Sequence, residues 1–403
     1  MTTSGAYSRD EVAGMIRTAL PGWTVESVER IDGGRNAVYE VAVTADGATR
    51  ELVLKARTET LPGAFEPEPF LLDALARRTE VPVPSVLGTV VDHETHPPFF
   101  LMERREGVSL SEGLDELATT ERDSLARTVG RYVGRVHLLG SFDRFGPLRV
   151  ERADPETGPV RDGGEPPAEP TADSAGGGSA GSPGGRGDGG PAARPRVGVS
   201  TGAGSPRAWY EPVEQGIEEP GFAIGVAETG HGDWASRLRE IASTALAALG
   251  GRFGDLRAEV RAVLAAVPAP DAKPVLAFGG PTDLLVDPDT GDPTSALDFE
   301  DATTTAARYD LVAAVDRLSG WAPPESDRRR RVREGVLVGY ETTTGRRPDP
   351  GTAACDGCRL VSHLPGLVEA ARREAAGTEG GTTAVNRRRA RVADLAQRCR
   401  SRA

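Results

Sequence analysis

The sequence predicts an α+β protein of two lobes, in which a small antiparallel β-rich lobe precedes a larger, mainly helical lobe. Segments of alternating β-branched residues fill the first quarter of the chain, whereas apolar residues spaced by three and four predominate later. The length of 403 residues allows two or three packed units. We expect an N-terminal lobe over residues 1–104, and a helical lobe formed by residues 105–153 and 207–403 around a disordered insertion at 154–206.

The elements of the first lobe follow from capping and turn signals. Ser8 precedes an apolar stripe with helical spacing, which predicts a capped helix. Asp-Gly signals at residues 32–34 and 46–47 separate the alternating segments and predict an antiparallel meander. The prolines of the second helix fall near its first turn, where they are tolerated. The expected helices are 8–20 and 65–78, and the expected strands are 23–31, 36–45, 50–58, 81–93 and 97–107.

The second lobe is expected to be helical from Ser111 onward. The stretch 154–206 consists largely of Gly, Pro, Ser and Ala, and it cannot bury enough apolar surface to offset its ordering entropy. A short β-hairpin region is expected to interrupt the helices, with strands at 273–278, 283–288 and 294–299. The expected helices are 234–251, 256–267, 309–321, 329–340, 366–376 and 384–400.

Composition excludes several classes of protein. The chain has 60 acidic and 48 basic residues and a formal net charge of −12, which argues against a nucleic-acid partner. An acidic, lysine-poor surface also fits a high-salt cytoplasm or a GC-rich genome. No apolar run reaches the roughly 18 to 20 residues that cross a bilayer, and no signal-peptide pattern is present, so we expect a cytoplasmic protein without membrane contact.

Cysteine usage favours a reducing compartment. The sequence contains three cysteines, too few for a disulfide framework. Cys355 and Cys358 form a C-D-G-C run that offers two zinc ligands but no second pair. A loop with two ordinary thiols is the favoured interpretation.

Lys55 stands out because the chain has only one other lysine, Lys273, and uses arginine for every other basic residue. It ends the third predicted strand, from which an ammonium group can reach the α- and β-phosphates of a nucleotide. Its expected partner is Glu68 on the following helix, with Glu66 as a substitute. The alternative is a lysine whose stem lies along a strand edge while its charge stays in water.

Two further features match what phosphoryl transfer requires. Gly33 and Gly34 allow backbone N–H groups to approach phosphates closely, although the turn of a plain hairpin explains them more simply. Asp298 directly follows a predicted β-hairpin, where a carboxylate at a strand end can bind Mg²⁺. The order of glycine turn, strand lysine, helix glutamate and hairpin aspartate strengthens each interpretation.

These motifs resemble the aminoglycoside phosphotransferase and choline kinase family, which has a two-lobed, protein-kinase-like fold. The runs that carry the resemblance are Val81 to Pro84, Pro98 to Glu103 with Gly107, Val129 to His137, Leu284 to Asp287, Leu297 to Glu300, and Tyr309 to Leu311. The resemblance implies an ATP cleft between the lobes, with adenine against the backbone of Met102, Glu103 and Arg105.

The resemblance also implies roles for single side chains. Lys55 contacts phosphates, Glu68 supports it, and Asp298 binds Mg²⁺. His137 packs the catalytic region. The implied ligands are therefore ATP, Mg²⁺ and a small-molecule acceptor.

The catalytic loop departs from the family pattern of His-Gly-Asp, four variable residues and Asn. The corresponding stretch is residues 277–283. In one alignment Phe278 replaces the histidine, and the position of the catalytic base is then Gly280. In the other, Pro281 and Asp283 align with the proline and the asparagine of the family's loop, and the position of the base is then Phe278. Neither register supplies a carboxylate. Asp283 can still replace the asparagine as a ligand of Mg²⁺.

Three functions follow as hypotheses. The first is ATP-dependent phosphoryl transfer to a small-molecule hydroxyl, slowed by the missing base, which is typically worth about 10²- to 10⁴-fold. The second is a nucleotide-binding pseudokinase that acts as a regulatory or scaffolding module. The third is a kinase-like relic that binds nothing, and the retained Lys55 and Asp298 argue against it.

Overall fold

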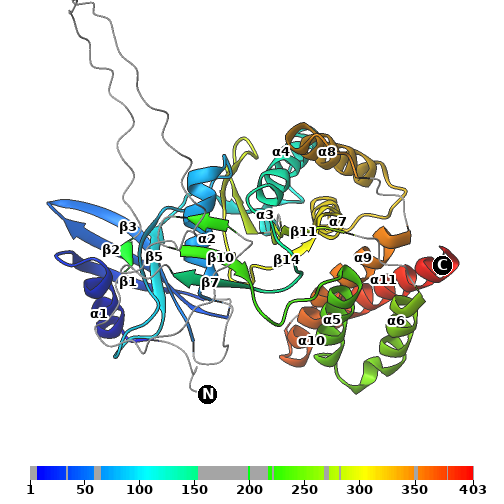
Figure 1. Cartoon of the computed structure of the whole chain (residues 1–403), viewed down its shortest axis with the longest axis horizontal. Helices are drawn as coiled ribbons and strands as arrows, with labels where there is room; N and C mark the ends of the chain where they lie inside the picture. Colours follow the sequence, from blue (N-terminus) through cyan, green and yellow to red (C-terminus); the bar gives the residue numbers. More distant parts are fainter. Residues whose placement is uncertain are drawn as a thin grey trace, which may run out of the picture.

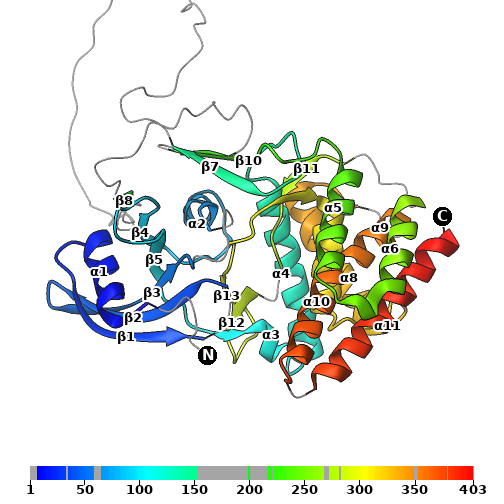
Figure 2. The ribbon, with the colours of Figure 1, turned by 90° about the horizontal axis from the view of Figure 1, so that it is seen from below.

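A computed structural model places the chain in two lobes, one rich in strands and one helical (Figures 1 and 2). The structure describes residues 7–32, 35–58, 65–152, 198–199, 217–219, 222–266, 272–280, 283–348, 353–378 and 380–402. The prediction of an α+β, two-lobed fold is confirmed. The exact lobe boundaries at residues 104 and 105 stay a prediction.

One mixed sheet forms the core of the N-terminal lobe. Its strand order is β1-β2-β3-β5-β4-β8, and every pair is antiparallel except β4 with β8. The strands are β1 (Thr24–Ile31), β2 (Ala37–Ala45), β3 (Ala48–Ala56), β4 (Val86–Val90), β5 (Phe99–Glu103) and β8 (Gly198–Val199). The strand expected over 81–93 is shorter, because Pro82 and Pro84 have no N–H to donate to a sheet.

Two helices belong to this lobe, and both were predicted. Helix α1 (Arg9–Ala19) begins at Ser8, whose hydroxyl accepts from the Glu11 N–H while the Glu11 carboxylate accepts from the Ser8 N–H. Helix α2 (Pro67–Arg78) carries its prolines in the first turn. It packs against β4 and lies above β5 in the view of Figure 2.

A small sheet joins the lobes. It consists of β6 (Val108–Ser109), β12 (Leu284–Val286) and β13 (Pro293–Ala296), in the order β13-β12-β6. Gly107 lies at the crossing with a φ of 134°, and a Cβ there would lie 2.6 Å from Thr294 Oγ1. The residue is a glycine because the linker passes so close to the hairpin.

The second lobe is mainly helical, as predicted. Helix α4 packs along α8, and glycines on both helices allow their backbones to approach. A Cβ on Gly130 would overlap the Val336 carbonyl, and one on Gly339 would overlap the Arg127 carbonyl. The helices are α3 (Leu110–Gly113), α4 (Thr119–His137), α5 (Trp234–Ala247), α6 (Gly254–Ala266), α7 (Ala307–Leu318), α8 (Asp327–Thr344), α9 (Ala353–Ser362), α10 (Leu364–Ala375) and α11 (Gly381–Arg402), with a 3₁₀ turn at Gly251–Phe253.

Three features differ from the prediction. Strands β7 (Leu148–Arg152), β9 (Ile217–Glu219) and β10 (Phe222–Val226) form a sheet beside α2, where only helix was expected. These segments are only three to five residues long, and the turn signal Pro220-Gly221 between β9 and β10 was not used in the sequence analysis. The second difference is a further unpredicted strand, β14 (Thr304–Ala306), which pairs with β11 (Pro274–Leu276).

The third correction concerns the C-D-G-C run, which is not a loop. Cys355 and Cys358 lie on helix α9 and are both buried, with 1% of their surface exposed. Burial raises the pKa of the Cys358 thiol to about 12. Among the described residues, neither cysteine belongs to a cluster with metal-binding geometry.

Most of the predicted insertion 154–206 lies outside the described residues. Gly198–Val199 is the exception, as strand β8. Gly33 and Gly34 also lie outside the described residues. None of the described helices is long and apolar enough to span a bilayer.

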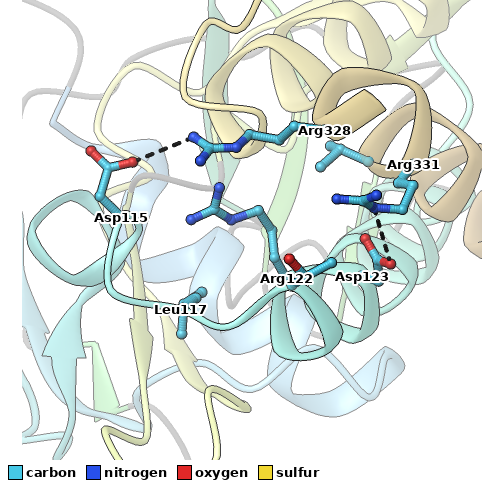
Figure 3. Close-up of a pocket in the computed structure, with 8 residues that line it drawn as sticks. Asp115, Leu117, Arg122, Asp123, Arg328 and Arg331 are labelled. Atoms are coloured by element: carbon cyan, nitrogen blue, oxygen red, sulfur yellow. Dashed lines mark ion pairs between the residues drawn. The ribbon is translucent and has the colours of Figure 1, made fainter. Parts of the chain in front are cut away.

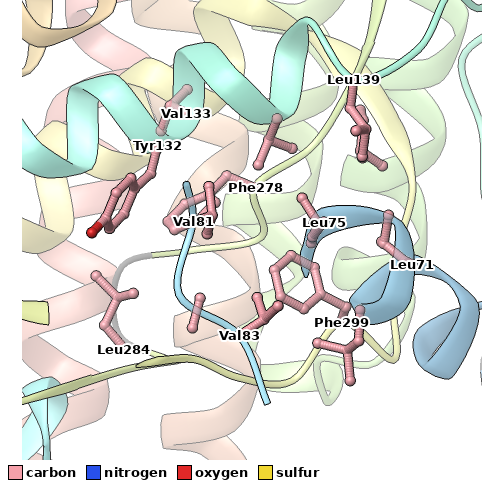
Figure 4. Packing of buried hydrophobic residues seen from close by; sticks show 14 of the residues in the cluster. Leu71, Leu75, Val81, Val83, Tyr132, Val133, Leu139, Phe278, Leu284 and Phe299 are labelled. Atoms are coloured by element: carbon pink, nitrogen blue, oxygen red, sulfur yellow. The ribbon is translucent and has the colours of Figure 1, made fainter. Parts of the chain in front are cut away.

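One hydrophobic cluster runs between the lobes and supports the region that was expected to be catalytic. Phe278 and Phe299 pack edge to face with ring centroids 6.5 Å apart. Figure 4 shows them between Leu71 and Leu75 of α2 and Val133 of α4. The two loops that frame the site are thus anchored in a common core.

Candidate active site

Lys55 is the centre of the candidate site. Its ammonium lies 2.7 Å from Glu68 Oε2, 2.9 Å from Asp298 Oδ1 and 3.0 Å from Glu300 Oε2. Lys55 is 6% exposed and Glu68 is 1% exposed. A lysine with its charge buried among three carboxylates is not a surface lysine at a strand edge. The predicted pairing of Lys55 with Glu68 is therefore present, while Glu66 instead faces Arg57 at 3.7 Å.

Glu68 connects α2 to the segment that carries Asp298. One of its oxygens faces Lys55, and the other accepts the N–H of Phe299 at 3.2 Å. Asp298 has a φ of 61°, a strained backbone conformation for a residue other than glycine. Such strain persists only where the surroundings enforce it, and it is typical of functional sites.

Glu300 is a site residue that the sequence analysis quoted but did not assign. Besides Lys55, it accepts a hydrogen bond from Asn36 Nδ2 at 2.6 Å and pairs with Arg35 at 2.9 Å. Arg35 also pairs with Asp301. The segment directly after the predicted glycine turn is thereby fastened to residues 300 and 301. The available signal was the acidic run Asp298-Phe299-Glu300-Asp301.

The charges in this cluster perturb one another. Burial would lower the pKa of Lys55, but the three carboxylates around it raise that pKa above its ordinary value. Burial raises the pKa of Glu68 to about 7, opposed by Lys55 and assisted by Asp298 and Glu300. Three acidic groups against one lysine and Arg35 leave an excess of negative charge, which a cation would neutralise.

The acidic oxygens fit a divalent cation. Glu68, Asp298 and Glu300 each offer a carboxylate oxygen, and these oxygens lie within 4.8 Å of one another. Carboxylates are the ligands that Mg²⁺ prefers. Asp283, the other predicted ligand, does not belong to this group of oxygens. It lies close enough to Asp298 and Glu300 for their charges to act on it.

The catalytic-loop segment is anchored by a buried polar chain. The Phe278 N–H donates to Asp310 Oδ2 at 2.7 Å, and the same oxygen lies 3.0 Å from His137 Nε2. His137 Nδ1 in turn lies 3.1 Å from the Tyr340 hydroxyl. His137 is 5% exposed, so it has the core role that was expected. Phe278 itself is buried at 4%, which makes it unsuitable as the position of an exposed base.

An arginine occupies the side-chain space at the other candidate base position. Arg317 Nη1 donates to the Gly279 carbonyl at 2.7 Å, and among the described residues no carboxylate forms an ion pair with Arg317. A Cβ added to Gly280 would overlap the guanidinium of Arg317. The sequence analysis missed Arg317, because nothing in the helix 309–321 marks it apart from the other arginines.

Asp283 is the first carboxylate that follows Gly280 along the sequence. Its side chain reaches solvent, and its N–H donates to the Gly280 carbonyl at 3.3 Å. Desolvation by the surrounding protein raises its pKa to about 6, with Asp298 adding to the effect and Arg317 opposing it. A carboxylate with a pKa near neutrality has the property of a general base.

The linker expected to hold adenine lies beside the small joining sheet. The N–H groups of Glu103 and Arg104 donate to the carbonyls of Ser85 and Glu51, so these two donors are not available to a ligand. Arg105 donates to the Thr294 carbonyl at 2.9 Å and pairs with Glu103 at 3.3 Å. Met102 is half-buried at the end of β5.

Comparison with known proteins agrees with this geometry. The family described as "Phosphotransferase enzyme family" matches residues 27–350. No curated protein matches the chain significantly. Among solved structures, a candidate aminoglycoside phosphotransferase of Ralstonia eutropha JMP134 superposes with a TM-score of 0.58 at 15% identity, over 98% of this chain and 99% of that one.

Two similar structures contain ligands. A thermostable mutant of the aminoglycoside phosphotransferase APH(4)-Ia, in a ternary complex with AMP-PNP and hygromycin B, has a TM-score of 0.52 at 13% identity, over 96% of this chain and 98% of that one. The amicoumacin kinase hAmiN, in complex with AMP-PNP, Ca²⁺ and Ami, has a TM-score of 0.51 at 13% identity, over 96% of this chain and 94% of that one. At these identities the likeness concerns the fold.

Proposed function

Because the chain belongs to the phosphotransferase enzyme family, we propose that it binds ATP with Mg²⁺ between its lobes and transfers phosphoryl groups slowly to a small-molecule hydroxyl. The observation that carries this proposal is the buried Lys55 among Glu68, Asp298 and Glu300. Burying several charges together is costly, and a site that neutralises phosphates and a cation explains why they are kept. The AMP-PNP in two proteins of the same fold supports the choice of nucleotide.

The residues present fit each part of the nucleotide site. Lys55 would contact phosphate oxygens, and Glu68 would hold Lys55 in place. Asp298 and Glu300 would hold Mg²⁺, which supplies charge neutralisation on the transferring group when bound. Arg35 and Asn36 would fix the position of Glu300.

The transfer step lacks a proton acceptor at its usual place. The bond from the γ-phosphorus to the bridging oxygen breaks while the acceptor oxygen bonds to that phosphorus, so the acceptor hydroxyl must lose a proton. Gly280 has no side chain, and the guanidinium of Arg317 cannot accept a proton. Positioning and charge neutralisation still act, so we expect turnover about 10²- to 10⁴-fold below that of an enzyme with the base.

Asp283 is the group through which slow transfer is proposed to occur. Its pKa of about 6 allows it to accept a proton at neutral pH. Its side chain is exposed, as contact with an acceptor requires. An Asp283→Asn variant that retains ATP binding and loses the residual transfer is the expected result.

A second function is favoured by a specific observation. The guanidinium of Arg317 fills the space at Gly280, so no aspartate fits there without moving it. This arrangement suits a pseudokinase, which binds nucleotide and signals or scaffolds without transfer. The two functions differ in turnover and share the nucleotide site.

The test is to incubate the protein with γ-labelled ATP, Mg²⁺ and a panel of hydroxylated and aminated small molecules, and to measure labelled product. Product that is absent in Lys55→Met and in Asp283→Asn supports slow transfer. ATP binding with no product from any acceptor supports the pseudokinase. The absence of ATP binding contradicts both functions.

A further inference from the structure

A second charged site lies where helix α4 begins beside helix α8, and it shares no residue with the candidate active site. Its cavity has a volume of about 70 Å³. One water takes up about 30 Å³ in the liquid, so a small ion fits. Its lining residues are Asp115, Leu117, Thr119, Arg122, Asp123, Arg328, Arg331 and Val332 (Figure 3).

Arg122 is the buried member of this site. It is 5% exposed, and one of its Nη atoms donates to the Leu114 carbonyl. Its Nε is buried and has no hydrogen-bond partner among the described residues. Desolvation lowers the pKa of Arg122, the nearby charge of Arg328 adds to the effect, and Asp115 and Asp123 oppose it without cancelling it. A buried cation that faces a second cation and keeps an unpaired donor needs a negative partner.

The two aspartates do not supply that partner fully. Asp115 lies 3.7 Å from Arg328, and Asp123 lies 3.6 Å from Arg331. Both distances exceed those of hydrogen bonds. The Asp115 side chain is 87% exposed, so most of its charge faces solvent. Three guanidinium groups against two carboxylates leave a net positive charge.

The start of α4 adds to this positive potential. Thr119 opens a helix of 19 residues, whose N-terminal end carries a partial positive charge. The preceding residue is Ala118, and its methyl side chain cannot accept a hydrogen bond as a cap would. Among the described residues, the Glu121 carboxylate accepts from the Ala118 N–H alone, at 2.7 Å. The first turn of the helix is open to another acceptor.

We propose that this cavity binds a phosphate-type oxyanion, either free orthophosphate or the phosphate of a monoester. Guanidinium groups match the geometry of phosphate oxygens and bind them with paired hydrogen bonds. In Figure 3 the guanidinium groups of Arg122 and Arg328 face the same space. Thr119 adds a hydroxyl donor at its edge.

The site is connected to the hairpin that precedes Asp298. Leu117 lines the cavity, and its side chain lies 3.2 Å from the position of a Cβ on Gly291, in the turn between β12 and β13. An anion bound in the cavity would link the loop before α4 to α8. It would thereby hold Leu117 against the turn that contains Gly291. The result is a protein whose stability rises with phosphate.

The test is thermal unfolding across a series of orthophosphate concentrations, with KCl adjusted to hold ionic strength constant. The wild-type midpoint rises and saturates. In Arg328→Gln/Arg331→Gln the apparent phosphate affinity falls at least about tenfold, since two charge-assisted contacts are lost. Both side chains are about half exposed, so the variant retains its fold. O-phosphoserine in place of orthophosphate shows whether a monoester also fits.

The matched control is Arg330→Gln. Arg330 lies on the same helix, is 57% exposed and pairs with Asp327 outside the cavity. It keeps the wild-type response. A Lys55→Met variant also keeps it, which separates this site from the nucleotide site. Equal phosphate responses in wild type and the double variant, or an equal response to KCl alone, overturn the proposal.

Discussion

The site around Lys55 and the loop around Gly280 lie at the same junction of lobes, yet they are preserved very differently. At Lys55, three carboxylates converge on one buried ammonium, and two of them, Glu68 and Glu300, are held by further partners. At Gly280, the side chain that would take up a proton is missing and Arg317 fills its space. The residues of the proposed nucleotide half are brought together, whereas the loop that would activate an acceptor departs from the family pattern.

The difference shows that the contacts that position the loop do not depend on a catalytic carboxylate in it. Asp310 and His137 still anchor the backbone at Phe278, as they would if a catalytic residue followed. The segment therefore keeps its position without its base. The position of this loop also serves packing, because Phe278 is part of the hydrophobic cluster shown in Figure 4.

The largest expected effect comes from rebuilding the altered half. In Gly280→Asp/Arg317→Ala, removing the guanidinium makes room for a carboxylate at the base position. We expect turnover to rise by about 10²- to 10⁴-fold, measured as labelled product from γ-labelled ATP.

Single variants serve as the controls for this gain. Gly280→Asp alone is expected to raise turnover less than the double variant, because the guanidinium of Arg317 stays beside the new carboxylate and holds its charge. Arg317→Ala alone is expected to leave turnover low. If the double variant is no faster than wild type, the missing base does not account for slow transfer.

The next effect concerns the preserved half. Lys55→Met removes the ammonium but keeps most of the side-chain volume, and ATP affinity should fall by about tenfold or more, since a charge-assisted contact to phosphate is lost. Equilibrium dialysis with labelled ATP measures it. The matched control is Lys273→Met, which changes the chain's other lysine, an exposed one, and should bind as wild type does.

A smaller effect is expected where the loop is anchored. Asp310→Ala leaves the Phe278 N–H and His137 without their shared acceptor, which should lower the free energy of unfolding by about 1 to 3 kcal/mol. Urea unfolding measures the loss. Asp143→Ala, at an exposed aspartate with only a 3.7 Å contact to Arg144, should cost far less. Equal losses would show that the polar chain does not hold the loop.

A further expected effect is a pH dependence of stability from Glu68. Without metal or nucleotide, its pKa is about 7 in the folded protein against an ordinary value of 4.5. The folded state keeps this proton where the unfolded state has released it, so stability falls as pH rises through that window. Chemical unfolding at several pH values in EDTA, with Glu68→Gln as the comparison, measures it. A stability that rises with pH only in the wild type contradicts the assignment.

The sequence predicted the preserved half better than the altered one. Lys55 and Glu68 were predicted as a pair, because scarcity of lysine and position on strand and helix are both visible in a sequence. The missing base was visible as well, since neither Phe278 nor Gly280 is a carboxylate. Arg317 was not, because its approach to Gly280 depends on how α7 packs, which a sequence pattern does not determine.

Other differences have similar causes. The strands β7, β9 and β10 are too short for their alternation to be distinguished, and they are stabilised by pairing with distant segments. Cys355 and Cys358 were taken for a loop as the alternative to a zinc site, and Gly357 between them has a weak preference for helix. Burial of both thiols against the rest of the lobe overrides that weak local preference.

The measurement that tests the central claim most directly is a calorimetric titration of the wild-type protein with ATP, with and without Mg²⁺. If Lys55, Asp298 and Glu300 bind nucleotide and cation as proposed, binding is saturable. Mg²⁺ strengthens it, because the cation neutralises Asp298 and Glu300 beside the phosphates. The absence of saturable binding under either condition would contradict the account and leave the buried lysine without a nucleotide to explain it.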